Sequence, residues 1–272
     1  MSAGGSMMLG GKELGRWSLF LVDRASILNL EDRLESDLKK YMREGVNNKM
    51  IKKYDIIGFE KAEKKITKLI TKFGGQPIGI KESQWPISEG WNNRKMMFVG
   101  QILLEKGMLG NKKDLMIYIF ITHSDNYEDD FFDPDAIEWS GGENAVIIQP
   151  LEEVYNEECI EGPTLFDSNN GRFEYIPILK EGSDPEFITS SKYQKLDDNE
   201  RSRYNELVDT DKIGGTPNFF RGDEWPEGEW KLLLQLHCNF QPFVLNLGAM
   251  PILFVFISSD FKNAGLLVQC YK

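Results

Sequence analysis

The stretch KFGGQPIGIKESQWP at residues 72–86 recurs later in the chain as KIGGTPNFFRGDEWP at residues 212–226. The matching residues are Lys72, Gly74, Gly75, Pro77, Trp85 and Pro86 in the first copy, and Lys212, Gly214, Gly215, Pro217, Trp225 and Pro226 in the second. Self-similarity at so long a period indicates a duplicated half-domain, because the repeats of solenoid proteins recur every ~20–50 residues. The fold is therefore expected to contain two related halves.

The similarity extends downstream of both copies. Placing Gln101 over Gln235 aligns two apolar runs that each carry one amide. Further apolar runs follow at residues 117–123 and 144–149 in the first half, and at residues 253–259 and 263–269 in the second. Short apolar runs bounded by turn residues are typical of buried strands. Each half is thus predicted to contain a glycine turn, a Trp-Pro corner and three strands.

The glycine pairs of the two copies, Gly74-Gly75 and Gly214-Gly215, are each followed by a proline and a strand-like run. A phosphate-binding loop spaces its glycines differently and opens a helix. A tight turn with positive φ is the favoured interpretation, because glycine adopts that conformation without steric cost.

The aromatic and amide residues of the motif are open to both structural and functional interpretations. Trp85 and Trp225 either stack on a ligand or fill a corner of the core, and their recurrence in both halves favours the core. Gln101 and Gln235 are expected to satisfy backbone groups inside the sheet, by pairing across the axis that relates the halves, because a buried amide needs hydrogen-bond partners.

These motifs resemble the YwqG-like family of bacterial proteins, a domain of unknown function. The family pattern is a Lys-hydrophobe-Gly-Gly-x-Pro turn, a Trp-Pro pair, a Leu-Ala-Gln-Ile-like strand and a Phe-Phe-Ile-Ser strand followed by acids. It is matched in order by residues 72–77, 85–86, 99–102 and 119–125, and the resemblance covers roughly residues 60–272. The second copy is more distantly similar to the programmed cell death protein 2 family, whose domain opens with a similar turn. The resemblance implies no catalytic residues, since the family has none established.

Length and composition are those of a globular chain that can bury a substantial core. Residues 1–25 are left unassigned, and residues 26–272 are expected to form one domain, with halves at about 72–150 and 212–272 and an acidic connector at 151–211. The expected fold class is α+β, with two repeat-related antiparallel β-sheets in pseudo-twofold symmetry, a shared core and N-terminal helices packed alongside.

Two helices are predicted before the first copy of the motif and one between the copies. Apolar residues recur every three or four positions over residues 27–44 and 59–72. The second of these helices has a lysine-rich face, for which a solvated surface is favoured over binding to an anionic membrane. Residues 197–207 are predicted to form a short helix with an aspartate at its cap. Residues 174–179 are predicted to form an edge strand.

The net charge of −11 is unevenly distributed, because acidic residues far outnumber basic ones in residues 125–211. Such a segment argues against a nucleic-acid partner, since phosphate binding depends on Lys and Arg.

The longest apolar run, residues 247–257, is shorter than the ~20 residues that span a bilayer, and the first residues show no secretory pattern. The odd number of cysteines, without a disulfide framework, fits a reducing cytosol. A cytoplasmic protein without a membrane partner is therefore expected.

The segment HSDNYEDDFFDPDAIE at residues 123–138 is the strongest candidate for a chemical site, because it combines a histidine with many carboxylates. Three of its aspartates offer oxygens to Ca²⁺, but their spacing departs from the EF-hand loop and the loop glycine is missing, so no metal is expected. The segment is either a solvated acidic loop or a docking surface for a basic protein, in which the phenylalanines act as anchors. The candidate partner-binding residues are Asp129, Asp130, Phe131, Phe132, Asp133 and Asp135.

The sequence shows no nucleophile–base pair, so no catalytic residue is assigned and no cofactor is expected. The favoured function is a non-catalytic protein-binding module, either a toxin-neutralising inhibitor or a chaperone for a basic client. The resemblance to the programmed cell death protein 2 family implies the chaperone. The alternative is a small-molecule-binding or hydrolytic enzyme that uses the cleft between the two halves. A deep polar cleft with perturbed pKa values would favour the enzyme, whereas a broad acidic or apolar exposed patch would favour the binding module.

Overall fold

The computed structural model describes residues 49–124, 132–154, 161–167 and 171–271. The chain divides into two compact units, residues 1–47 and 48–272, and every described residue belongs to the second unit. The unassigned N-terminal segment and the first predicted helix therefore lie outside the described residues.

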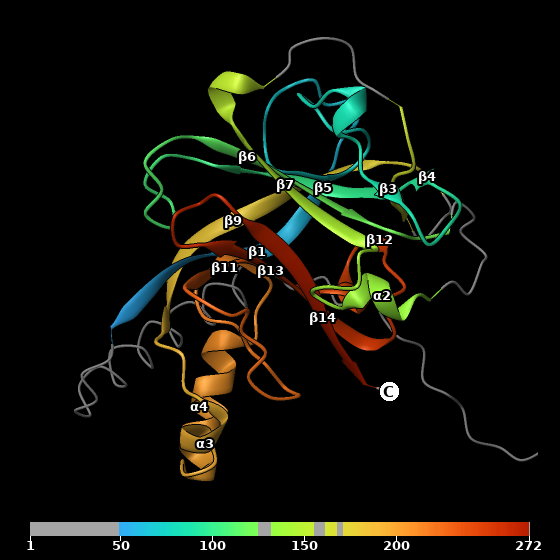
Figure 1. Ribbon diagram of the computed structural model, residues 1–272. Coiled ribbons are helices and arrows are strands. Elements are labelled where there is room, and N and C mark those ends of the chain that lie inside the picture. The colour runs from blue at the N-terminus through green and yellow to red at the C-terminus, as the bar shows by residue number, and fades with distance from the viewer. Residues whose placement is uncertain (1–48, 125–131, 155–160, 168–170, 272) are drawn as a thin grey trace, which may run out of the picture. The chain divides into compact units, whose positions relative to one another are not determined.

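Ten antiparallel strands form one continuous sheet in the second unit (Figure 1). Their order across the sheet is β14-β13-β11-β10-β1-β9-β2-β5-β6-β7. In chain order the strands are β1 (Met50–Lys61), β2 (Lys72–Gly74), β5 (Met97–Leu104), β6 (Leu115–Ile121), β7 (Asn144–Pro150), β9 (Glu174–Pro185), β10 (Lys212–Gly214), β11 (Trp230–His237), β13 (Ala249–Ser258) and β14 (Ala264–Tyr271). The edge strands β7 and β14 pack against each other, so the sheet curls into a nearly closed barrel.

Shorter elements decorate this sheet. Two ribbons of two strands each pair β3 (Ile87–Ser88) with β4 (Arg94–Lys95), and β8 (Phe166–Asp167) with β12 (Phe243–Val244). The described helices are α2 (Pro134–Ile137), α3 (Ser190–Tyr193) and α4 (Asp198–Val208), and single 3₁₀ turns occur at η1 (Glu82–Gln84), η2 (Leu151–Glu153) and η3 (Cys238–Phe240).

The prediction of a helix at residues 197–207 is confirmed. Asp197 caps α4, because its side chain accepts a hydrogen bond from the Glu200 N–H while Glu200 bonds back to the Asp197 N–H.

The predicted α+β fold with two separate sheets is wrong. The central strands β1 and β9 pair with each other along almost their whole length and join the two halves into one sheet. On one side β1 pairs with β10 of the second half, and on the other side β9 pairs with β2 of the first half. Two separate sheets would leave the short strands β2 and β10 as open edges, whereas β9 and β1 supply the hydrogen-bond partners for these edges. The same pairing places residues 174–179, predicted to be an edge strand, in the middle of the sheet.

The second predicted helix, over residues 59–72, is also wrong. Residues 59–61 complete β1, in register with β9, and β2 begins at Lys72 without an intervening helix. Phe59 packs edge-on against Phe73 and Phe243, with ring centroids 5.6 Å apart in both pairs. Long-range strand pairing and aromatic packing therefore override a local pattern of helical periodicity, which is a weak determinant by itself.

The two halves share one apolar core, as the sequence predicts. Along β6 the alternate residues Ile117, Ile119 and Ile121 face this shared core, and along β13 Leu253, Val255 and Ile257 do the same. The intervening residues of these strands face two further apolar clusters, one in each half. Both faces of the sheet are therefore buried at β6 and β13, which explains why these strands are apolar runs without alternating polar residues.

Candidate functional site

The two glycine turns have the predicted positive φ. The φ values are 71° and 65° for Gly74 and Gly75, and 78° and 79° for Gly214 and Gly215. A Cβ atom on the second glycine of each pair would collide with a carboxylate of β9, that of Glu174 in the first half and that of Asp184 in the second. The glycines therefore allow the chain to fold closely over a buried acid.

Each buried acid holds the lysine that begins the motif. Lys72 and Lys212 are both fully buried. Lys72 pairs with Glu174, and the Nζ of Lys212 lies 2.6 Å from Asp184 Oδ2. Burial lowers the pKa of Lys212 to about 8, although the attraction of Asp184 opposes this shift. These lysines are enclosed by the fold, and their role in it is structural.

Gln101 and Gln235 lie directly opposite the two buried lysines in the strand register. Each amide bonds to backbone groups of its own half, and not to the other amide as predicted. In each half, the amide oxygen of the glutamine accepts from the backbone N–H six residues after the motif lysine. The amide nitrogen donates to the backbone carbonyl two residues before that lysine. The bonds are Ile78 N to Gln101 Oε1 (2.9 Å), Gln101 Nε2 to Ile70 O (2.9 Å), Asn218 N to Gln235 Oε1 (2.8 Å) and Gln235 Nε2 to Thr210 O (2.9 Å).

The Trp-Pro corner of the first half is sealed inside the protein. Trp85 is 3% exposed, its Nε1 donates to the Met96 carbonyl at 2.8 Å, and its ring packs on Phe120. The chain at Gly162 lies so close to the ring that a Cβ there would collide with it. Two hydrogen bonds between Gln76 and Gly162, each 2.9 Å long, hold this covering segment in place. Trp85 thus has the core role that its recurrence predicts.

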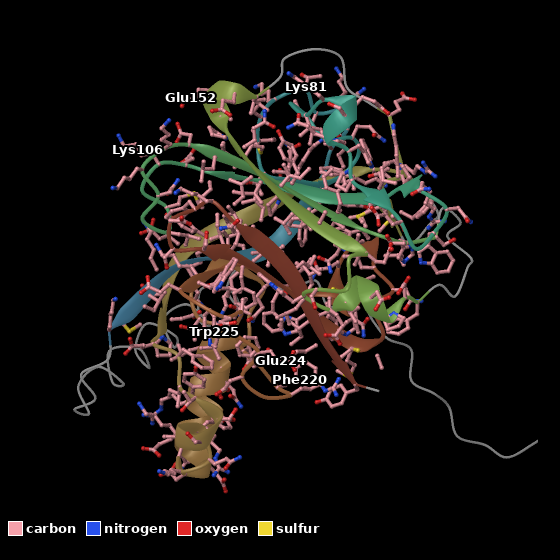
Figure 2. The ribbon with its side chains drawn as sticks, in the orientation of Figure 1. Lys81, Lys106, Glu152, Phe220, Glu224 and Trp225 are labelled. Atoms are coloured by element: carbon pink, nitrogen blue, oxygen red, sulfur yellow. The ribbon has the colours of Figure 1, made fainter. Side chains whose placement is uncertain are left out.

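The corresponding corner of the second half is open. Trp225 and Phe220 come from the segment between β10 and β11, and Figure 2 shows them at separate places on the protein. Trp225 is half-buried and packs edge-on against Phe187 and Phe219, with ring centroids 5.4 and 5.8 Å away. Its remaining surface lines a cavity of about 460 Å³. The core interpretation of Trp225 is therefore incomplete, because part of the ring is available to a ligand.

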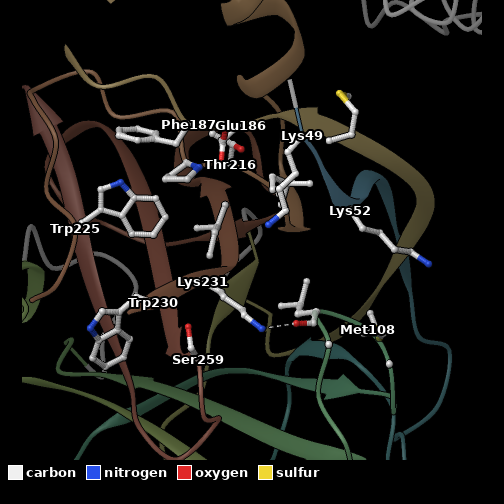
Figure 3. A pocket seen from close by; sticks show the side chains of 18 residues that line it. Lys49, Lys52, Met108, Glu186, Phe187, Thr216, Trp225, Trp230, Lys231 and Ser259 are labelled. Atoms are coloured by element: carbon white, nitrogen blue, oxygen red, sulfur yellow. Dashed lines mark hydrogen bonds between the residues drawn. The ribbon is translucent and has the colours of Figure 1, made fainter. Parts of the chain in front are cut away.

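Both halves contribute to this cavity, which we call the interhalf pocket (Figure 3). The first half supplies the turn at residues 107–110 between β5 and β6, and residues 49–52 come from the start of β1 and the residue before it. The second half supplies the glycine turn at residues 215–217, together with Trp225 and Trp230. The cavity therefore lies in the cleft between the halves that the sequence interpretation names as the alternative functional site.

Two lysine ammonium groups point into the interhalf pocket, across from the two tryptophans (Figure 3). Lys231 Nζ donates to the Leu109 carbonyl at 2.7 Å, and burial together with the nearby charge of Lys49 lowers its pKa. Neither Lys49 nor Lys231 forms an ion pair with an acidic side chain of the described residues. Lys52 also lines the cavity, but it pairs with Glu181 at 3.0 Å and points away.

Among the described residues that line the interhalf pocket, the acidic one is Glu186, next to Phe187. Glu186 and Lys49 are both exposed to solvent, so water screens their charges more than the charge of the half-buried Lys231. The interior of the pocket therefore combines an aromatic wall with an excess of positive charge.

The acidic segment predicted to bind a partner is only partly described. Asp129, Asp130 and Phe131 lie outside the described residues. Phe132 is 45% exposed. Asp133 caps α2, where its Oδ1 accepts from the Asp135 N–H at 2.8 Å, and its other oxygen accepts from the Trp91 indole. The Asp133 side chain thus stabilises local structure. No group of metal-ligating side chains occurs in the described part of the chain.

A titratable cluster that the sequence interpretation missed surrounds His237. Its Nδ1 lies 2.8 Å from Asp211 Oδ1 and its Nε2 lies 2.8 Å from Asp209 Oδ1. Burial lowers the pKa of His237, but the hydrogen bonds to Asp209 and Asp211 outweigh burial and raise the pKa to about 9. The bond to His237 lowers the pKa of Asp209. At neutral pH the cluster is therefore an imidazolium ion between two carboxylates, with a net charge of about −1.

The strand register explains how this cluster forms and how it could have been found. Lys212 faces Gln235 across β10 and β11, and antiparallel pairing then brings the residues just before β10 next to the end of β11. Asp209 and Asp211 precede the motif lysine, and His237 follows the motif glutamine by two positions. Aligning the strands on Gln235 therefore would have paired the histidine with the two aspartates.

Comparisons with known proteins assign no family. No family model matches this chain, and no curated protein is similar to it at a significant level. The resemblance to the YwqG-like family therefore stays a prediction. Among the described residues, no helix is both long and apolar enough to cross a membrane.

Proposed function

We propose that this protein is a non-catalytic binding module that holds an anionic small molecule with a flat apolar part in the interhalf pocket. The observation that carries this proposal is the difference between the two copies of the Trp-Pro motif. The chain around Gly162 covers Trp85, whereas Trp225 faces a cavity. The motif tryptophan is thus part of the core in the first half, whereas in the second half it presents part of its ring to a cavity.

The size and lining of the interhalf pocket suit a small ligand. Its volume of about 460 Å³ lies within the roughly 300–1,000 Å³ of typical small-molecule sites. Trp225 and Trp230 offer flat apolar surfaces, on which an aromatic or other planar group stacks favourably. Thr216 and Ser259 add polar atoms at the wall, although the Thr216 hydroxyl already donates to the Pro185 carbonyl at 2.5 Å.

The charge of the pocket selects an anion. Burial lowers the pKa of Lys231, and repulsion by the nearby charge of Lys49 lowers it further. A carboxylate or phosphate placed between the two ammonium groups would offset this repulsion and would raise the pKa of Lys231. A basic protein, the partner expected from the sequence, would be repelled here, so this pocket does not support that part of the prediction.

The lowered pKa of Lys231 fits the enzyme alternative, but the described lining of the interhalf pocket shows no complete catalytic pair. Among its described lining residues, neither Ser259 nor Thr216 has a histidine or carboxylate side chain positioned to take its proton. The lysines bind charge without an adjacent nucleophile. Binding without turnover is therefore the function that this geometry favours over hydrolysis.

Three compounds with the same ring and different charges test the proposal: 1-naphthoate, 1-naphthylmethanol and 1-naphthylmethylammonium. We expect 1-naphthoate to quench tryptophan fluorescence and to bind about tenfold more tightly than the cationic compound. Trp225→Ala and Lys231→Met should each weaken the binding of 1-naphthoate, whereas Trp91→Phe, outside the pocket, should leave it unchanged. Equal binding of all three compounds, or unchanged binding by Trp225→Ala, would contradict the proposal.

A further inference from the structure

We propose that a second pocket, beside His237, binds an exposed lysine side chain of a basic partner protein. This pocket has a volume of about 230 Å³ and is separate from the interhalf pocket, with which it shares no lining residue. We call it the histidine pocket. Its occupant is inferred from three features of its lining: exposed apolar side chains, one open carboxylate oxygen and the net charge around it.

The rim of the histidine pocket exposes unusually large apolar side chains. Phe240, Met250 and Tyr271 line it and are 76%, 58% and 58% exposed. Phe220 stacks on Tyr271, with ring centroids 4.9 Å apart, so these two rings form a joint flat surface. A cluster of exposed apolar side chains around one pocket is typical of an interaction surface, because leaving it in water is unfavourable.

Asp209 provides the specific contact. Its Oδ1 accepts from both His237 Nε2 (2.8 Å) and Asn218 Nδ2 (2.9 Å), while no described residue bonds to its Oδ2. The Asp209 side chain is 49% exposed and it lines the pocket. Asp211, by contrast, has both oxygens occupied, by His237 and by Gln241. One carboxylate oxygen is thus open to a cation that enters the pocket.

The charges around Asp209 favour a cation overall. His237 is positive and lies between two negative carboxylates, so these three groups carry a net charge of about −1. Lys212 also acts on Asp209, but it is fully buried and paired with Asp184. The chain as a whole has a net charge of −11, which attracts basic partners over longer distances.

The geometry selects lysine over arginine. The guanidinium group of arginine binds best to both oxygens of a carboxylate, and His237 and Asn218 already occupy one oxygen of Asp209. A lysine ammonium is a point charge that needs a single acceptor. Its methylene stem can lie along Phe240 and Met250, and its charge is attracted by the face of Tyr271.

Matched peptides test this proposal directly. The probes are N-acetyl-Gly-Lys-Gly-amide and the same peptide with arginine or norleucine in place of lysine, titrated into the full chain with NMR detection of the His237 ring. We expect the lysine peptide to shift the His237 signals and to bind about fivefold more tightly than the other two. Its affinity should fall as the salt concentration rises, since the contact is electrostatic.

Two variants and one control connect the binding to this pocket. Asp209→Asn keeps the size of the side chain, and Phe240→Ala removes an exposed ring, so neither should unfold the protein. Each should weaken binding of the lysine peptide about fivefold. Glu152→Gln removes the same charge at an exposed site that Figure 2 shows far from Phe220, and it should leave binding unchanged.

Three results would overturn the inference. Equal binding of the lysine and norleucine peptides would show an apolar surface without charge recognition. Equal losses in Asp209→Asn and Glu152→Gln would show general attraction to an acidic protein. Self-association in sedimentation experiments that Phe240→Ala abolishes would assign the surface to a second copy of this chain.

Discussion

Removing the carboxylate of Asp184 should destabilise the fold strongly. Asp184 is fully buried, its Oδ2 lies 2.6 Å from Lys212 Nζ, and its Oδ1 lies 2.8 Å from Lys53 Nζ. In Asp184→Ala, Lys53 keeps Asp55 as a partner at 2.9 Å, but Lys212 keeps only the Val208 carbonyl. The variant therefore leaves one buried ammonium group without a counter-ion.

The expected cost follows from that single unpaired charge. Breaking a buried ion pair by removing one partner costs about 3–5 kcal/mol, and the loss of the acceptor for the Thr216 N–H adds to this. Glu181→Ala is the matched control, since it breaks the exposed pair with Lys52 and should cost much less. Urea denaturation at pH 7 gives the free energy of unfolding of both variants.

The pH dependence distinguishes an unpaired charge from lost packing. The folded pKa of Lys212, about 8, lies below the ordinary value of 10.5, so the unfolded state binds more protons between these values. The contribution of Lys212 to stability therefore rises with pH from about 8 to 10.5. Asp184→Ala should lower this folded pKa further. The difference in free energy of unfolding between wild type and variant should therefore narrow as the pH rises toward 8, and should stay constant above pH 8.

A second substitution completes this test. Lys212→Met in the Asp184→Ala background removes the unpaired ammonium and should recover most of the lost stability. The reasoning would be refuted if Asp184→Ala cost no more than Glu181→Ala, or if the double variant were less stable than Asp184→Ala alone.

Three further predictions concern other parts of the fold. The His237 ring should titrate near pH 9 in an NMR experiment, and a midpoint near 6.5 would contradict the aspartate contacts. Because this pKa lies above the ordinary 6.5, the contribution of His237 to stability is complete below pH 6.5 and is lost as the pH rises through 9. Gly215→Val should lower the free energy of unfolding by roughly 1–3 kcal/mol, because φ there is 79°, and an unchanged melting temperature would exclude this role. Gln101→Leu should cost about 1–3 kcal/mol by leaving two backbone groups unsatisfied, whereas the exposed Gln194→Leu should cost little.

The repeated motif made the local structure predictable. Gly74, Gly75, Gly214 and Gly215 have the positive φ that a Gly-Gly-x-Pro turn requires, and the apolar runs form the strands that follow them. These features depend on residues close together in sequence, where steric rules decide the conformation.

The way in which the halves join could not be predicted from the same pattern. It depends on β1 and β9, which lie outside the motif, and their pairing connects residues more than a hundred positions apart. Phe59 shows the difficulty, because its spacing from the following apolar residues fits a helix, whereas its contacts with Phe73 and Phe243 place it in a strand. Only long-range pairing distinguishes the two.

The candidate sites were hidden for a related reason. The two copies of the motif look equivalent in sequence, so recurrence favours the same core role for both tryptophans. The difference arises from Gly162, which lies outside both copies and covers Trp85 alone. A pocket formed by the absence of such a cover leaves no signal within the motif itself.

One backbone hydrogen bond that both halves make has a charged acceptor in the second half and a neutral one in the first. In the first half the Leu103 N–H donates to the Thr71 hydroxyl at 3.0 Å, and in the second half the His237 N–H donates to Asp211 Oδ1 at 2.7 Å. Thr71 and Asp211 directly precede the motif lysines, and Leu103 and His237 each follow the motif glutamine by two positions. The same backbone bond is therefore kept in both halves. Replacing a hydroxyl by a carboxylate preserves that bond and adds a charge, and replacing leucine by histidine adds a group that the charge can hold. The histidine pocket therefore depends on residues by which the second half differs from the first, while the lysines and glutamines that the halves share maintain the sheet.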